Sequence, residues 1–226
     1  RTVCIVRERG AAIDMPSNLN AAQRREHGIQ NGCYPPDVKA VEYTCANARF
    51  GMGEGVFIFN GDWQNAAYDT DMPGNIGFFL MPPADASGSP AAMSAPLTYG
   101  IAATAKNADC AAFFFNWVAS NDEARQINVT IGGSNPGGPS GLVMPSVAPG
   151  SVTNETLAAG VVVGEAGTSM DFIANATSAI FAQGWTPELQ KMVGGRPDAA
   201  GLLTAVQEGY LSCLLYPSDP SREPPH

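Results

Sequence analysis

The pattern of hydrophobic and polar positions divides the chain into three zones. Residues 1–49 show no sustained periodicity of either the helical or the strand kind, so this zone is left unassigned. Between residues 50 and 210, short apolar runs are followed by segments with helical spacing. Residues 211–226 end in a proline-rich stretch that is typical of a disordered tail. The organised part of the pattern therefore covers residues 50–210.

Three short apolar segments of the middle zone are predicted to be strands. Residues 55–60 end at Gly61-Asp62, and residues 75–81 end at two prolines. The third segment, residues 96–104, is rich in β-branched and aromatic positions. Short runs of this composition between turn-forming residues are typical of buried strands.

Helical spacing begins near residue 108. Phe114, Trp117 and Val118 follow the i, i+3, i+4 pattern of one apolar stripe. Residues 120–122 predict a break and a new N-cap before a second helix over residues 123–128. The glycine- and proline-rich residues 132–139 must form a loop.

The rest of the middle zone is predicted to be helical. Thr186-Pro187-Glu188 has the features of a helix start, and Gly194-Gly195 has those of a helix end. Strands followed by several helices indicate an α/β fold with a helical C-terminal end. The expected helices cover residues 157–163, 171–183, 187–193 and 198–215.

Composition places the chain among globular proteins, with 45% hydrophobic and 15% charged residues. The net charge of −9 argues against nucleic acid and against anionic membrane surfaces as partners, because both attract clustered Lys and Arg. A neutral, hydroxyl-rich ligand is compatible with this charge. No apolar run approaches the roughly 18–20 residues of a membrane span. No signal-peptide pattern is visible at Arg1 either.

Cysteines and histidines offer little material for metal or redox chemistry. The five cysteines include no CxxC pair, and their odd number leaves at least one thiol free in a monomer. A disulfide between Cys33 and Cys45 is one option. With only two histidines in the chain, a Cys/His zinc site lacks ligands. The GxSxG and HExxH motifs are also absent. We therefore expect no metal and no cofactor, and the catalytic classes with these motifs can be set aside.

Five segments occur in an order and spacing that resembles a known family. The stretch from Gly53 to Trp63 is similar to the "GxxAMxxxGxW" segment of family 1 extracellular solute-binding proteins, the maltose-binding-protein-like components of ABC sugar transporters. Val56 and Phe57 stand where that family usually has Ala and Met. The other similar segments are residues 76–82, 99–107 and 109–124. Residues 132–136 and 207–210 fit the family pattern as well.

The resemblance implies a type II periplasmic-binding-protein-like fold, of which residues 50–210 would represent the C-terminal half with parts of both lobes. It further implies a substrate-binding component that captures a mono- or oligosaccharide for uptake and delivers it to the membrane permease of an ABC transporter. Such a protein works outside the cytoplasm, in the periplasm or attached to the cell surface. Two alternatives stay open: a truncated or rearranged fragment that binds no ligand, and a carbohydrate-active enzyme.

A sugar site needs aromatic faces for the C–H side of the ring, and carboxylates or amides for its hydroxyls. Trp63, directly after a strand end, is the first candidate, with a core or surface indole as the alternative. Asp62 and Asn60 lie at the same strand end, where turns also favour both residue types. The resemblance adds Tyr99, which could contact ligand, and Asp171 with Phe172, which could instead be a helix-start acid and a core residue.

Overall fold

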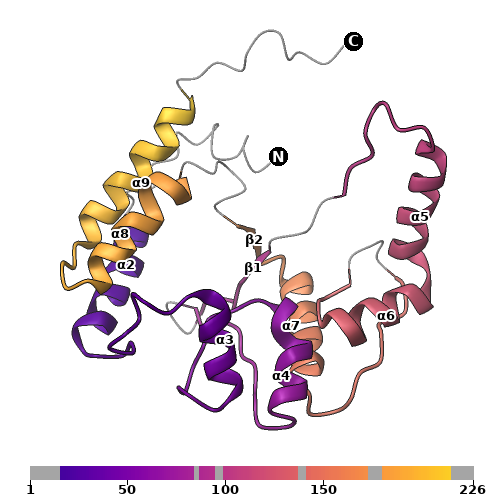
Figure 1. Cartoon of the computed structure of the whole chain (residues 1–226), viewed down its shortest axis with the longest axis horizontal. Helices are drawn as coiled ribbons and strands as arrows, with labels where there is room; N and C mark the ends of the chain where they lie inside the picture. The colour runs from indigo at the N-terminus through magenta and orange to yellow at the C-terminus, as the bar shows by residue number, and fades with distance from the viewer. Residues whose placement is uncertain (1–15, 84–86, 95–98, 137–140, 173–179, 215–226) are drawn as a thin grey trace. The chain divides into compact units, whose positions relative to one another are not determined.

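The computed structural model describes residues 16–83, 87–94, 99–136, 141–172 and 180–214 (Figure 1). The chain divides into two compact units. The first unit combines Arg1–Val41 with Asp171–His226, and the second is formed by Glu42–Met170.

The first unit packs around α9 (Ala199–Leu214). Against it lie α2 (Pro16–Gln30), a π-helical segment (Ile180–Trp185) and α8 (Thr186–Val193). The side chains of Ile180, Leu202 and Val206 are fully buried at the centre of this packing. A continuous apolar core therefore joins an early helix to the last part of the described chain.

Helix α8 begins and ends as the local signals predict. Pro187 occupies the first turn, where a missing N–H costs nothing, and Glu188 is the acid of that turn. The helix ends at Gly194, and Gly195 adopts a left-handed φ of 85°. This turn lets the Arg196 N–H donate to the Lys191 carbonyl at 3.1 Å, which satisfies one of the last helix carbonyls.

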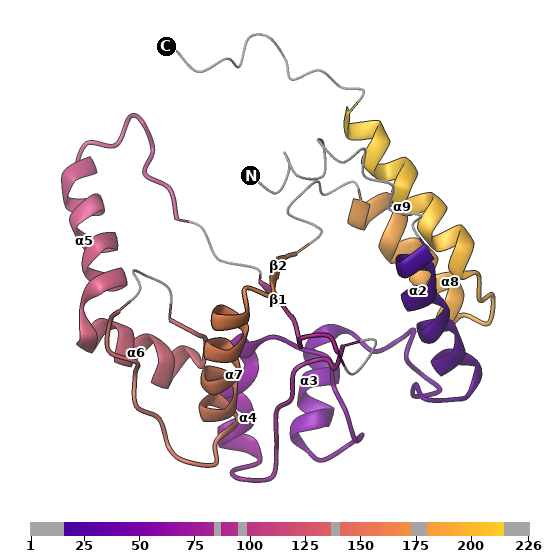
Figure 2. The same ribbon diagram turned by 180° about the vertical axis from the view of Figure 1, so that it is seen from behind.

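The second unit is mainly helical and holds the small sheet. Strands β1 and β2 pair with each other. The helices α4 and α7 lie side by side, which both ribbon views show (Figures 1 and 2). Its elements are α3 (Tyr43–Gly51), a 3-10 turn (Asp62–Gln64), α4 (Asn65–Asp71), β1 (Ala92–Ser94), α5 (Ala108–Ser120), α6 (Asp122–Gly132), α7 (Val152–Ala166) and β2 (Ser169–Asp171).

Polar side chains of α4 fix its neighbours. The Asp69 carboxylate accepts from the Val152 N–H at 2.7 Å, and from the N–H and hydroxyl of Thr153 at 3.2 and 2.6 Å. It thus satisfies free N–H groups at the start of α7. The buried Asn65 amide donates to the Thr156 hydroxyl at 2.7 Å and to the Gly133 carbonyl at 3.2 Å. These bonds connect α4 to α7 and to the end of α6.

The helix predictions that rest on local signals are confirmed. The break between α5 and α6 falls at Asn121, whose side chain accepts from the Ala124 N–H at 3.0 Å. The helix expected near residues 157–163 is α7, which is longer than predicted. The helices expected over residues 187–193 and 198–215 are α8 and α9. Two helices of the unassigned zone, α2 and α3, were not predicted.

The strand predictions are wrong for the described residues. Residues 55–60 and 99–104 form no ladder, and in residues 75–81 only Met81 makes an isolated bridge, to Ala91. Residues 95–98 lie outside the described part. The physical reason is that strand composition becomes a strand only when another strand completes its hydrogen bonds. The fold is therefore α/β only in a loose sense, with many helices and one two-stranded sheet.

Two further expectations need correction. The helix predicted from residue 171 does not start there, because Asp171 ends strand β2. Residues 173–179 lie outside the described part, and residues 180–185 are π-helical. The Cys33–Cys45 disulfide is also wrong, because both residues are exposed free thiols.

Candidate functional site

A hydrogen-bonded cluster of phenol, amide and indole groups connects α3 to the segment before α4. The Trp63 indole N–H donates to the Tyr43 hydroxyl at 2.5 Å, which in turn donates to Asn60 Oδ1 at 3.0 Å. The Asn60 amide nitrogen donates to Asn47 Oδ1 and to the Tyr68 hydroxyl. The Tyr68 hydroxyl donates to Asn47 Oδ1 at 2.5 Å. We call these five residues the amide–phenol network.

The amide–phenol network has a buried part and an exposed part. Asn47 and Tyr68 are buried, whereas Tyr43 and Trp63 are each 55% exposed. Burial raises the pKa of the Tyr68 phenol, the hydrogen bond from Asn60 opposes the change, and the nearby Tyr43 adds to it. Tyr68 is therefore a neutral donor at neutral pH, which suits its hydrogen bond to Asn47.

Contacts on two sides hold the Trp63 side chain in place. Its indole N–H is fixed by Tyr43, and its six-membered ring lies against Gly61. A Cβ atom at Gly61 would come within 2.1 to 2.5 Å of three atoms of this ring, so only glycine allows the approach. The residue as a whole is nevertheless about half exposed. Trp63 is thus an oriented aromatic surface and not a core residue.

A hollow of about 230 Å³ lies between α3 and α4 beside this network. Its walls offer phenol, hydroxyl and amide groups and one carboxylate, and the lining includes no Lys or Arg. Groups of this kind can donate to and accept from the hydroxyls of a neutral ligand. The lining residues are Tyr43, Thr44, Asn47, Ala48, Gln64, Tyr68 and Asp71.

Asp62 has a structural contact in addition to its place beside Trp63. One carboxylate oxygen accepts from the Asn135 N–H at 2.6 Å. The loop after α6 approaches α4 closely, because a Cβ at Gly133 would lie 2.7 Å from the Ala66 nitrogen. Asp62 therefore helps to hold this loop in place, and it does not line the hollow.

Of the predicted residues, Asn60 and Trp63 belong to the amide–phenol network, and Asp62 precedes Trp63 in the chain. None of these three residues is part of the lining of the hollow. Tyr99 is 73% exposed, with its ring 5.5 Å from that of Phe115 and no place in the lining of the hollow. Phe172 belongs to the first unit, where its ring lies 5.1 Å from that of Phe181. The side chain of Asp171 lies outside the described part.

Sequence reasoning missed three members of the network: Tyr43, Asn47 and Tyr68. Tyr43 and Asn47 are one helical turn apart on α3, in the zone without clear periodicity. Their bonds reach partners 13 to 21 positions away. No local signal marks such contacts.

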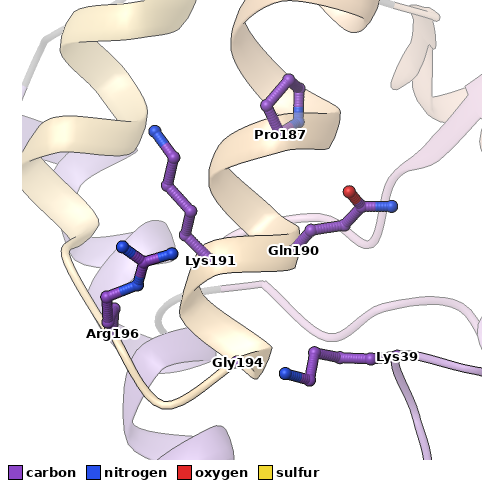
Figure 3. A pocket seen from close by; sticks show the side chains of 6 residues that line it. All are labelled: Lys39, Pro187, Gln190, Lys191, Gly194 and Arg196. Carbon is purple, nitrogen blue, oxygen red and sulfur yellow. The ribbon is translucent and has the colours of Figure 1, made fainter.

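A second hollow, of about 350 Å³, lies in the first unit and has a different chemistry. It is lined by Lys39, Pro187, Gln190, Lys191, Gly194 and Arg196 (Figure 3). Lys191 is paired with Glu188 at 2.5 Å. The Lys39 ammonium is 3.3 Å from where a Gly194 Cβ would lie, at the carboxyl end of α8, where a cation is favourable. Lys191 thus has a structural partner, and a hollow with three cations does not suit a neutral ligand in particular.

Comparison with protein-family models finds no match, and comparison with curated proteins finds none either. Within the described ranges, no group of three or more His, Cys, Asp or Glu residues is placed to hold a metal ion. No helix in the same ranges is long and apolar enough to cross a membrane. The amide–phenol network and its hollow are therefore the structural features that bear on ligand binding.

Proposed function

We propose that this protein binds a neutral carbohydrate at the amide–phenol network and serves as the substrate-binding component of an ABC transporter. One observation carries the proposal: the exposed Trp63 indole is hydrogen bonded to Tyr43, which lines a hollow together with hydroxyl, amide and carboxylate groups. Sugar rings need this combination, because their C–H faces stack on aromatic rings while their hydroxyls exchange hydrogen bonds. The net charge of −9 suits an uncharged ligand.

The binding mode follows from the positions of these groups. Trp63 supplies the stacking surface, worth roughly 0.5–1.5 kcal/mol by comparison with aromatic pairs. Asp71 is the one carboxylate of the lining, and a hydrogen bond from a sugar hydroxyl to it adds about 1.5–3 kcal/mol. The hollow is smaller than the roughly 300–1,000 Å³ of drug-sized sites. It therefore suits one sugar ring, and further rings of an oligosaccharide would extend into solvent.

Binding without turnover is the better proposal for this site. Hydrolysis of a glycosidic bond uses two carboxyl groups about 5–9.5 Å apart, one on each side of the bond. The lining of the hollow contains only Asp71 as an acid. Asp62 is committed to the Asn135 N–H. A carbohydrate-active enzyme is thus the less favoured alternative.

The transport role and the finer fold rest on the resemblance. Asn60, Asp62 and Trp63 belong to the segment that is similar to family 1 solute-binding proteins, and the candidate site contains Asn60 and Trp63. The proposal therefore includes a type II periplasmic-binding-protein-like fold, a membrane permease as partner and a place outside the cytoplasm. It needs no metal and no cofactor.

A tryptophan-fluorescence titration tests the proposal. The chain has three tryptophans, so the double variant Trp117→Phe/Trp185→Phe leaves Trp63 as the sole reporter. We expect a saturable change in its emission with one member of a panel of mono- and oligosaccharides. The same sugar should raise the melting temperature of the unaltered chain, by an amount equivalent to about 2.7 kcal/mol at 100 times its Kd.

Two variants separate the site from other causes. Trp63→Phe should weaken the sugar-dependent thermal shift, whereas Trp117→Phe should leave it unchanged. Tyr43→Phe removes the hydroxyl that fixes the indole and should weaken binding without unfolding the chain, since Tyr43 is half exposed. A shift that survives Trp63→Phe would place the site elsewhere. A folded chain without any response would exclude a working sugar site, and release of sugar products would favour the enzyme.

A further inference from the structure

The segment of residues 55–59 combines strand composition with unusual exposure. Val56 is 81% exposed, Phe57 77% and Phe59 68%, although the sequence pattern predicts a buried strand. Large apolar side chains in a cluster of this kind mark a contact surface more often than isolated exposed ones do. The segment is also uncharged from residue 55 to residue 61.

The backbone of this segment lacks partners as well. Among the described residues, no hydrogen bond involves an N–H or C=O group of residues 55–59. Unpaired backbone groups of an apolar, β-prone segment are a template for another strand. The segment therefore has both elements of an open sheet edge, namely free main-chain groups and apolar side chains.

The exposed surface continues onto a second segment. The rings of Phe57 and Phe79 meet edge to face, with their centroids 5.9 Å apart. Phe79 and Met81 are themselves 62% and 57% exposed. Phe57 and Phe79 are thus in contact, and Val56, Phe59 and Met81 are exposed apolar side chains of the same two segments. We call these five residues the Phe57 surface.

We propose that two copies of this chain associate through the Phe57 surface, with residues 55–59 of one copy pairing antiparallel with the same residues of the other. Antiparallel pairing of one segment with itself is symmetric, so each copy supplies what the other needs and the assembly closes as a dimer. The pairing gives main-chain hydrogen bonds to groups that have none within the described part of the chain.

Charge does not oppose a second copy as the occupant of this surface. Two chains of net charge −9 repel each other over most of their surfaces. The Phe57 surface is an uncharged region where they can meet, and the nearby Glu54 carboxylate is paired with Arg49 at 2.7 Å. Like charges therefore do not oppose each other at this contact.

The area is sufficient for a dimer at the lower limit of stability. With roughly 150–250 Å² for each large side chain, the exposed fractions amount to on the order of 600 Å² per copy. Two copies would bury about 1,200 Å², where stable interfaces begin. We therefore expect a reversible dimer and not an obligate one.

Helix α5 provides the matched control. Phe113 is 73% exposed, close to the value for Phe57, and it also lies in an apolar surrounding. The backbone of α5 is hydrogen bonded within the helix, so this helix offers side-chain contacts only. Phe57→Lys and Phe113→Lys are thus the same change at equal exposure, and only the first touches the segment with free main-chain groups.

The test measures the mass of the full chain in solution across concentrations that bracket a Kd of about 1–10 μM. We expect a dimer that is lost in Phe57→Lys and kept in Phe113→Lys. Val56→Pro, which removes one N–H donor, should weaken it too. The amides of residues 55–59 should exchange with solvent about tenfold or more slowly in the concentrated sample. Far-UV circular dichroism checks that each variant keeps its helices.

Three results would overturn the proposal. The first is a monomer at every concentration. The second is a dimer that Phe113→Lys abolishes and Phe57→Lys does not, which would assign the contact to α5. The third is slow exchange of residues 55–59 that does not depend on concentration, which would mean that the single chain, or another bound partner, covers the segment.

Discussion

Replacement of Gly184 by alanine is a sharp test of the packing in the first unit. Gly184 lies in the π-helical segment against α9, where a Cβ would be 2.8 Å from the Ala205 carbonyl oxygen and from the Val206 Cα. All three nearest atoms belong to the backbone of α9. No side chain can rotate away to make room, so one element must move.

The size of the movement gives the size of the effect. Carbon atoms pack best at about 3.5–4.0 Å, so the π-helical segment and α9 must separate by roughly 0.7 Å or more. This separation loosens the contact between Ile180 and Val206, which are both fully buried. Added methyl groups in a packed core cost about 1–3 kcal/mol. Since alanine also favours helical backbone by up to about 1 kcal/mol, we expect a net loss of about 1–2 kcal/mol.

Gly164→Ala is the same chemical change with the opposite expected sign. Gly164 lies inside α7, and an added Cβ there would have no atom within 4 Å. Alanine should therefore stabilise α7 by about 0.5–1 kcal/mol, because it removes backbone freedom from the unfolded chain. The pair separates steric effects from the general effect of a methyl group.

Urea denaturation measures both variants. Trp185, next to Gly184, reports on the first unit, and circular dichroism reports on helix content as a whole. Because the chain has two units, each unit needs its own transition and not one value for the whole protein. A Gly184→Ala variant with unchanged or raised stability would refute the close packing of Gly184 on α9.

The remaining predictions concern the second unit. Asp69→Ala removes three hydrogen bonds at the start of α7 and should lower the free energy of unfolding by about 2 kcal/mol. The backbone amides of Val152 and Thr153 should then exchange faster with solvent. A loss of stability below about 0.5 kcal/mol would contradict this role of Asp69. Burial raises the pKa of Tyr68 above its ordinary 10.0, so the unfolded chain loses this proton at a lower pH than the folded protein. Stability from this group is therefore complete below pH 10.0 and falls as the pH rises through the raised pKa. A pH series of melting temperatures should fall less steeply above pH 10.0 in Tyr68→Phe, and equal slopes would argue against a buried Tyr68.

Helices with local signals could be predicted from the sequence, and those without could not. The break at Asn121 and both ends of α8 follow from capping and glycine chemistry that involves adjacent residues only. Helix α2 was missed because its apolar stripe is thin. Among its described side chains, Leu19, Ala22 and Ile29 pack against the core, and the intervening turn carries the partly buried Glu26. Such a stripe can be recognised as a core-facing surface only from the structure, in which α2 packs against α9.

The candidate site was predictable in part for a similar reason. Asn60 and Trp63 stand out because they follow an apolar run and belong to the segment that carries the resemblance. Tyr43 and Tyr68 join them through bonds that the chain topology creates. Asp62 shows the opposite case. Its position next to a candidate tryptophan made it a candidate ligand-binding residue, but in the structure its carboxylate accepts from the Asn135 N–H.

Residues 55–59 and α5 differ in the interactions that a binding partner would add. Both residues 55–59 and α5 have the composition of buried elements, and in both the aromatic side chains are largely exposed. A helix satisfies its own backbone, so exposure of α5 costs only the hydrophobic term, about 25 cal/mol for each Å². Residues 55–59 in addition have main-chain groups without hydrogen-bond partners among the residues that the structure describes. Their gain from pairing is therefore both apolar and hydrogen bonded, which is why Phe57 is the position to change first.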